Sequence, residues 1–261
     1  MSFRRRWPWL IAGALGVLVV ASGVLVAFFP ARWAWHWLRA DYPLVRVGQV
    51  SGSVWNGRAQ GLRVRGQSLG MLHWTLGRAA LWGNVMLHVD LGGAGVMVNG
   101  HIQRDGDGAI VVRDMRFDVP MVRLKVLWPT GMRLAGHVQG DVARATLVEG
   151  WPTQLDARVH WSDAAVTYAG KTLALGQWCS RWHAAGGTVV SAALSDDGRG
   201  LVGMHGTLTA TLLGWRLDAT LTPRRAVPGL DAWLARLGRR AADGSVHVER
   251  KGGLMAGRTW Q

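Results

Sequence analysis

Apolar and polar residues alternate through most of the chain after residue 45, and this period of two limits the fold more than any other feature. In residues 155–161, LDARVHW, every odd position is apolar and every even position is polar. Successive side chains of a strand point to opposite faces of a sheet, so the pattern predicts strands with one buried face. Further sets predicted to share a face are Val85, Leu87, Val89 and Leu91; Met115, Phe117 and Val119; Leu134, Val138 and Val142; and Trp215, Leu217, Ala219 and Leu221.

Short polar turns separate these strands and favour antiparallel pairing. Examples are Asp105-Gly106-Asp107-Gly108 and Asp196-Asp197-Gly198. Parallel strands would be continuous apolar runs with helices between them, because both of their faces are buried. The sequence therefore predicts a mainly β fold built on an antiparallel sheet.

Two short helices are expected beside the sheet. Leu230, Trp233, Leu234 and Leu237 follow the i, i+3, i+4, i+7 spacing of one helix face after Pro228-Gly229, and Gly238 is placed to end the helix. The segment from Trp33 to Leu38 predicts a second helical piece that continues from the apolar amino terminus and ends before Pro43.

The amino terminus predicts a membrane anchor. Residues 10–29 carry no charge, and twenty helical residues reach about 30 Å, the thickness of the hydrocarbon layer. Arg4, Arg5 and Arg6 precede this run, which keeps residues 1–9 in the cytoplasm by the positive-inside rule. We therefore expect a membrane protein with a transmembrane helix at 10–29, a juxtamembrane segment at 30–44 and an exported β-rich domain at 45–261.

Two alternatives to this amino-terminal arrangement stay open. The small-residue triplet Ala21-Ser22-Gly23 fits a cleavable signal peptide, although uncharged residues continue past it to Phe29. Tryptophans at 33, 35 and 37 fit the headgroup level of a membrane, where indoles settle. The alternative for Trp33, Trp35 and Trp37 is that they pack on the domain.

Charge and cysteine content exclude several functional classes. The formal net charge is +14, but the basic residues after the amino terminus are scattered, with no nucleic-acid-binding motif, so we expect no nucleic-acid partner. Acidic lipid headgroups or acidic proteins suit this charge better. Cys179 is the only cysteine, so one chain forms no disulfide and no cysteine-based zinc site.

Motifs that resemble catalytic or metal sites do not have the context that such chemistry needs. Residues 66–70, GQSLG, match the nucleophile pattern G-x-S-x-G. A catalytic serine of this type lies on a sharp turn, the nucleophile elbow, between a buried strand and a helix, whereas the strands predicted on both sides of Ser68 are half-exposed. We expect a turn there, and a hairpin turn at 105–108 instead of a calcium loop. Cys179 and His183 fit a strand with an inert buried thiol better than a metal pair. The dispersed histidines form no ligand set, so we predict no catalytic residue, no metal site and no cofactor.

A faint internal repeat pairs a glycine with a later tryptophan. Gly52 precedes Trp74 by 22 residues and Gly136 precedes Trp161 by 25, each across two predicted strands. The repeat leaves two readings open: a domain of two similar halves, or chance similarity among glycine-rich strands.

Residues 50–59, VSGSVWNGRA, resemble the opening strand and turn of type II secretion system protein N, the general secretion pathway N component. The glycine-tryptophan strand from Leu69 to Leu76 and the late Leu-x-x-Leu-Gly segment at 234–238 follow the same plan. AsmA-type envelope proteins, with an anchor and a long curled sheet, are loosely similar. The resemblance implies an elongated, curled, AsmA-like periplasmic sheet behind a single transmembrane helix, with one short carboxy-terminal helix.

The resemblance also implies a role. It points to an accessory, non-enzymatic subunit that scaffolds inner-membrane platform proteins of the secretion machine, with the outer-membrane secretin as a further partner. Trp55 and Arg58 are the candidate partner contacts, and Gly52, Gly57, Trp74 and Trp161 are the candidate structural positions. The alternative function is an AsmA-like envelope protein that binds or transfers lipid in an apolar β-groove.

Overall fold

The computed structural model describes residues 30–38, 43–64, 66–104, 106–127 and 133–253. The predicted anchor at 10–29 and Arg4 to Arg6 lie outside these residues. Among the helices that are described, none has the length and apolar character needed to cross a membrane.

One antiparallel sheet contains every described strand. The strands on its first half are β1 (Val45–Arg46), β2 (Gln49–Gly52), β3 (Asn56–Val64), β4 (Gln67–Leu76), β5 (Val85–Gly93), β6 (Val96–Arg104), β7 (Ile110–Pro120) and β8 (Arg133–Val148). Those on its second half are β9 (Trp151–Tyr168), β10 (Lys171–Ala185), β11 (Val190–Asp196), β12 (Val202–Thr211), β13 (Gly214–Pro223), β14 (Arg239–Arg240) and β15 (Val246–Gly253). The helical elements are α2 (Ala31–Leu38), η1 (Arg78–Trp82), η2 (Met121–Leu127) and α3 (Leu230–Leu237).

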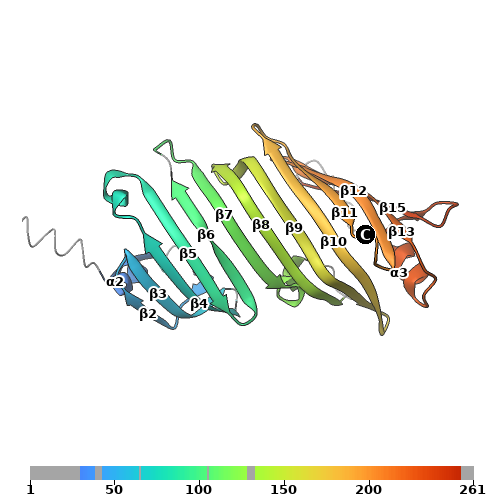
Figure 1. Cartoon of the computed structure of the whole chain (residues 1–261), viewed down its shortest axis with the longest axis horizontal. Helices are drawn as coiled ribbons and strands as arrows, with labels where there is room; N and C mark the ends of the chain where they lie inside the picture. The colour runs from blue at the N-terminus through green and yellow to red at the C-terminus, as the bar shows by residue number, and fades with distance from the viewer. Residues whose placement is uncertain (1–29, 39–42, 65, 105, 128–132, 254–261) are drawn as a thin grey trace, which may run out of the picture.

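The sheet is a meander, because from β3 to β13 each strand pairs with the next one in the sequence. β1 and β2 both pair with β3 at one end, and β14 and β15 form the other end, which does not pair back to the first. Figure 1 shows the result as an elongated sheet whose strands cross its long axis at a slant. Its antiparallel order and elongation agree with the expectation from the sequence.

The two faces of the sheet differ in chemistry along its whole length. Cross-strand register places Trp74 opposite Val89, Val138 opposite Trp161, and Trp161 opposite Trp178 on one side, which we call the apolar face. On the other side, the polar face, the register brings His73 opposite Asp90 and Asp141 opposite Arg158. The predicted alternation is thus confirmed in β5, β7, β8, β9 and β13.

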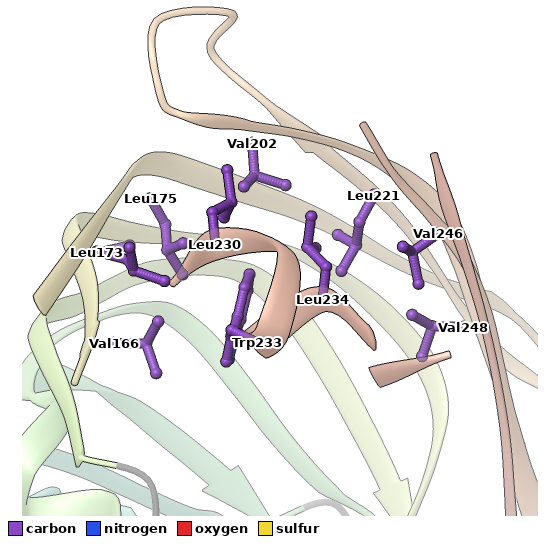
Figure 2. Close-up of a cluster of buried hydrophobic side chains, with 11 residues drawn as sticks. Val166, Leu173, Leu175, Val202, Leu221, Leu230, Trp233, Leu234, Val246 and Val248 are labelled. Atoms are coloured by element: carbon purple, nitrogen blue, oxygen red, sulfur yellow. The ribbon is translucent and has the colours of Figure 1, made fainter. Parts of the chain in front are cut away.

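The best-covered part of the apolar face lies under α3, at the carboxy-terminal end. Leu230, Trp233 and Leu234 are buried from the helix side, and Figure 2 shows them within the curve of the surrounding strands. Their partners on the sheet are Val166, Leu173, Leu175, Val202, Leu221, Val246 and Val248. The helix predicted from the spacing of its apolar residues is confirmed at Leu230–Leu237.

Gly238 ends α3 differently from the expected left-handed cap. Its φ is −173°, an extended conformation that any residue can adopt. A Cβ atom at this position would overlap the carbonyl oxygen of His247 on β15. Close approach of two backbones, and not a left-handed turn, therefore explains the glycine.

Candidate partner-contact turn

The β2–β3 connection carries the motif that singled out residues 52–59. Gly52 has a φ of +86°, and a side chain there would crowd the carbonyl oxygen of Asn56 at 2.5 Å. Across the turn, the amide of Ser53 donates to the Asn56 carbonyl at 2.9 Å, and the amide of Asn56 donates to the Ser53 hydroxyl oxygen at 3.1 Å. These bonds fix a tight connection that only glycine fits at position 52.

Gly57 and Trp74 form the packed centre of this turn. Gly57 is buried on the apolar face directly opposite Trp74, and a Cβ atom on Gly57 would overlap the indole ring. The indole nitrogen of Trp74 donates to the carbonyl oxygen of Val54 at 3.0 Å. Trp74 therefore connects β4 to the turn, through space that Gly57 leaves empty.

The two candidate contact residues occupy different environments. Trp55 is half-buried, and its carbonyl oxygen accepts a hydrogen bond from the amide of Leu76 at 2.7 Å. Arg58 is exposed on the polar face opposite His73, and its Nε donates to the Ser51 hydroxyl at 3.1 Å. The bond to Ser51 orients an otherwise accessible guanidinium, which is a group suited to an acidic partner.

The segment that follows the predicted anchor lies against this same turn. Pro30 forms an isolated antiparallel bridge with Ser53, and Ala31 is 3% exposed where α2 contacts β2. Trp33 is exposed and Trp35 half-buried, whereas the side chain of Trp37 lies outside what the structure describes. Placement of these tryptophans at a headgroup layer stays a prediction. Sequence reasoning missed Ser53, whose signal was the Ser-x-x-Asn spacing of a turn.

Trp161 repeats part of the Trp74 arrangement in the middle of the sheet. Its indole nitrogen donates to the carbonyl oxygen of Ala135 at 3.0 Å, next to Gly136 with a φ of +105°. Its ring meets that of Trp178 edge to face, with centroids 5.4 Å apart. In both places an indole binds a carbonyl near a left-handed glycine, yet the division of the domain into two halves stays a prediction.

The motif around Ser68 and the dispersed His, Cys, Asp and Glu side chains were the other candidates for chemistry in the sequence. Ser68 lies within strand β4, after the turn at Gly66, and not in the turn itself as we expected. The carbonyl oxygen of Ser68 accepts a hydrogen bond from the Arg123 guanidinium at 3.3 Å. No group of three or more His, Cys, Asp and Glu side chains in the described ranges is arranged to hold a metal ion.

Cys179 does not occupy the buried position that we expected. It lies on the polar face of β10, partly exposed, with its sulfur 3.1 Å from Nδ1 of His160. Partial burial raises the pKa of the Cys179 thiol, and the charges of Asp197 and Asp196 add to this effect. The period-two pattern around Trp178 and Trp182 explains the difference, because it assigns odd positions to the polar face.

These features define a class of protein: a single two-faced antiparallel sheet with a short helix packed on its carboxy-terminal end. Comparison with known proteins identifies the family. The sequence pattern of the family described as "Type II secretion system (T2SS), protein N" matches residues 43–249. The chain is 28% identical over 249 residues to the type II secretion system protein N of Klebsiella pneumoniae, covering 89% of this chain and 92% of that protein.

The chain therefore belongs to the type II secretion system protein N family. No solved structure gives a significant match. The matched range includes the 52–59 turn, every strand of the meander from β3 to β13, and α3.

Proposed function

We propose that this protein is an accessory inner-membrane subunit of a type II secretion system. In this role residues 10–29 anchor it in the membrane, and the sheet lies in the periplasm, where it scaffolds the platform subunits and contacts the secretin. Family membership over residues 43–249 is the observation that supports the proposal most directly. The sheet contributes large, regular surfaces, which suit assembly.

The 52–59 turn is the proposed contact with platform subunits. It lies at the end of the sheet from which α2 leads back toward the predicted anchor, so it stays close to other proteins that are anchored in the same membrane. Arg58 supplies an accessible, oriented cation and Trp55 a half-buried aromatic side chain. Arginine and tryptophan are the residue types that most often dominate the binding energy of protein interfaces.

Site-specific photo-crosslinking in native membranes tests this proposal. A photoreactive residue at position 58 is expected to capture a platform subunit, whereas one at His205, exposed on the polar face of β12, is the matched control. If neither position captures a secretion subunit in cells that secrete normally, the scaffold role is rejected.

A second candidate function is lipid binding on the apolar face. One observation favours it: Val89, Phe117 and Val138 on that face are only half-buried, and the described helix α3 covers the other end of the sheet. A face of this kind suits acyl chains. Mass spectrometry of gently extracted protein would detect co-purifying phospholipid. Val138→Asp is expected to remove it, whereas His137→Asp, one residue away on the polar face, is not.

A further inference from the structure

One long edge of the sheet carries exposed apolar side chains at its turns. In a meander every second connection lies on the same edge, so the β4–β5, β6–β7, β8–β9, β10–β11 and β12–β13 connections share one. Figure 1 shows η1 and the β8–β9 and β10–β11 connections along its upper edge. We call the following exposed residues at these connections the hairpin rim: Leu81, Trp82, Val148, Val189, Leu212 and Leu213.

The rim side chains are far more exposed than the fold requires. Trp82 is 81% exposed, Leu212 59% and Leu213 55%. Tight connections are normally built from Gly, Asn, Asp and Ser, which tolerate turn geometry and water. Single exposed apolar residues need no explanation, but several of them concentrated along one edge mark an interaction surface.

The opposite edge has a different chemistry. Its connections carry more basic residues: Arg123, Lys171, Arg199, Arg224 and Arg225. They also carry the exposed apolar residue Val122, which is 49% exposed, and the acidic residues Asp197, Asp231 and Asp243. On the rim edge, the exposed residues Arg78 and Arg104 are accompanied by the acidic residues Asp107 and Glu149. The rim is therefore distinguished by its apolar side chains and not by net charge.

The spacing of the rim favours a fluid bilayer as its occupant. Neighbouring connections on one edge are two strands apart, about 10 Å, so the rim extends over about 40 Å from η1 to the β12–β13 connection. A lipid surface accepts separated protrusions one by one, whereas a protein would need a matching series of pockets. Leucine and tryptophan are also the residues that anchor peripheral segments at the headgroup boundary.

The chain outside the described residues points to the same occupant. The described structure begins at Pro30, directly after the twenty uncharged residues predicted to cross the membrane. A sheet attached to that segment remains at high effective concentration beside the bilayer. The exposed apolar side chains of a tethered domain therefore need little additional affinity to remain inserted in the bilayer.

We propose that the hairpin rim inserts into the headgroup region of the bilayer that holds the predicted anchor, so that the sheet lies lengthwise along the membrane. Trp82, Leu212 and Leu213 enter the boundary between headgroups and acyl chains, and the opposite edge is turned away. The inference depends on the predicted anchor and is independent of which secretion subunits are bound.

Depth-dependent fluorescence quenching tests the orientation with the full-length chain. In a Cys179→Ser background, single cysteines are introduced by Trp82→Cys and Leu213→Cys, and by Lys171→Cys and Arg199→Cys as controls on the opposite edge. Each is labelled with an environment-sensitive dye and reconstituted into phosphatidylethanolamine and phosphatidylglycerol vesicles. All four side chains are exposed, so these changes remove no core packing, and circular dichroism verifies the sheet.

Dyes at 82 and 213 are expected to show blue-shifted emission and to lose intensity when lipids carry a nitroxide near the headgroup. Dyes at 171 and 199 are expected to keep the emission of dye in water. Equal behaviour of both edges, or water-like emission at the rim, would overturn the proposal. A blue shift without quenching by nitroxide lipids would assign the rim to a protein contact and would reject membrane insertion. Failure of the chain to float with the vesicles would also reject the proposal, because the predicted anchor would then not hold the sheet at the bilayer.

Discussion

The indole nitrogen of Trp74 donates a hydrogen bond to the carbonyl oxygen of Val54 at 3.0 Å, across the space where Gly57 has no side chain. This contact joins β4 to the turn that also meets the segment after the predicted anchor, through the bridge between Pro30 and Ser53. The residues that resemble the protein N family thus form one packed unit, from which the Arg58 guanidinium is exposed.

Gly57→Ala is expected to destabilise the protein by about 1 to 3 kcal/mol, the usual cost of adding atoms to a packed position. The added Cβ would overlap the Trp74 ring and lie 2.8 Å from the Ser53 carbonyl oxygen. Thermal unfolding followed by circular dichroism measures the effect. Gly92→Ala is the control, since a Cβ there meets nothing within 4 Å, and an equal loss in both variants would contradict the account.

Arg58→Glu is expected to reduce secretion without changing the stability of the protein, because the side chain is exposed and its packing is limited to Ser51. Loss of an arginine contact at the centre of an interface commonly costs about 2 kcal/mol or more. Secreted protein in the medium, at equal levels of the variant, is the readout. Arg58→Lys should retain part of the function, and Arg158→Glu, also exposed on the polar face, should be neutral. Similar secretion by Arg58→Glu and wild type would refute the role of Arg58.

Trp233→Ala is expected to lower the free energy of unfolding by about 3 to 5 kcal/mol, because it empties the centre of the cluster beneath α3. Trp233→Phe should cost much less. The indole nitrogen of Trp233 is buried with no hydrogen-bond partner in the described part of the chain, so phenylalanine removes no such bond. Chemical denaturation distinguishes the two variants. Equal losses in the two variants would contradict the view that Trp233 stabilises the protein by filling the space beneath α3.

The Asp196–Arg224 ion pair makes stability depend on acid pH. Burial alone would raise the pKa of the Asp196 carboxyl, but hydrogen bonds from Arg224 and from the amides of Met204 and Gly198 outweigh burial and hold the pKa below its ordinary value of 3.8. A lowered pKa in the folded state means that the carboxylate stabilises the fold above pH 3.8. This stabilisation is lost as the pH falls through the folded-state value.

Asp196→Asn should therefore lower stability by about 1 to 3 kcal/mol at pH 7, the range for hydrogen bonds to charged groups. The difference from wild type should shrink as the pH falls below 3.8, where the wild-type carboxyl also becomes neutral. Melting temperatures of both proteins across this range provide the measurement. Glu249→Gln, in exposed ion pairs with Arg216 and Lys251, is the control and should show a much smaller effect at pH 7, because water screens exposed pairs. A constant difference at every pH would exclude the proposed linkage.

The strands and the later helix were predictable because both signals are local. Alternation at Val85 to Leu91 reports the pleat of one strand, and the spacing of Leu230, Trp233 and Leu234 reports one helix face. The position of Cys179 was predicted wrongly, because the prediction gave more weight to the tryptophans beside it than to its place in the alternation.

The candidate site was only partly predictable. The 52–59 motif directed attention to Gly57 and Trp74, but their contact depends on the register between β3 and β4. The bridge from Pro30 to Ser53 joins residues that have no shared local pattern. The apolar pair Leu212-Leu213 in a connection was visible in the sequence, yet its relation to Trp82 required the order of the strands.

The sequence by itself determined a mainly β chain, the two-faced character of its strands, the helix at 230–237 and the family resemblance, since each depends on neighbouring residues along the backbone. Only the tertiary structure decided which part of the apolar face α3 covers, and which connections share one edge of the sheet. Strand pairing brings together residues that are distant in the chain, and their contacts depend on register and strand order, which no local pattern encodes.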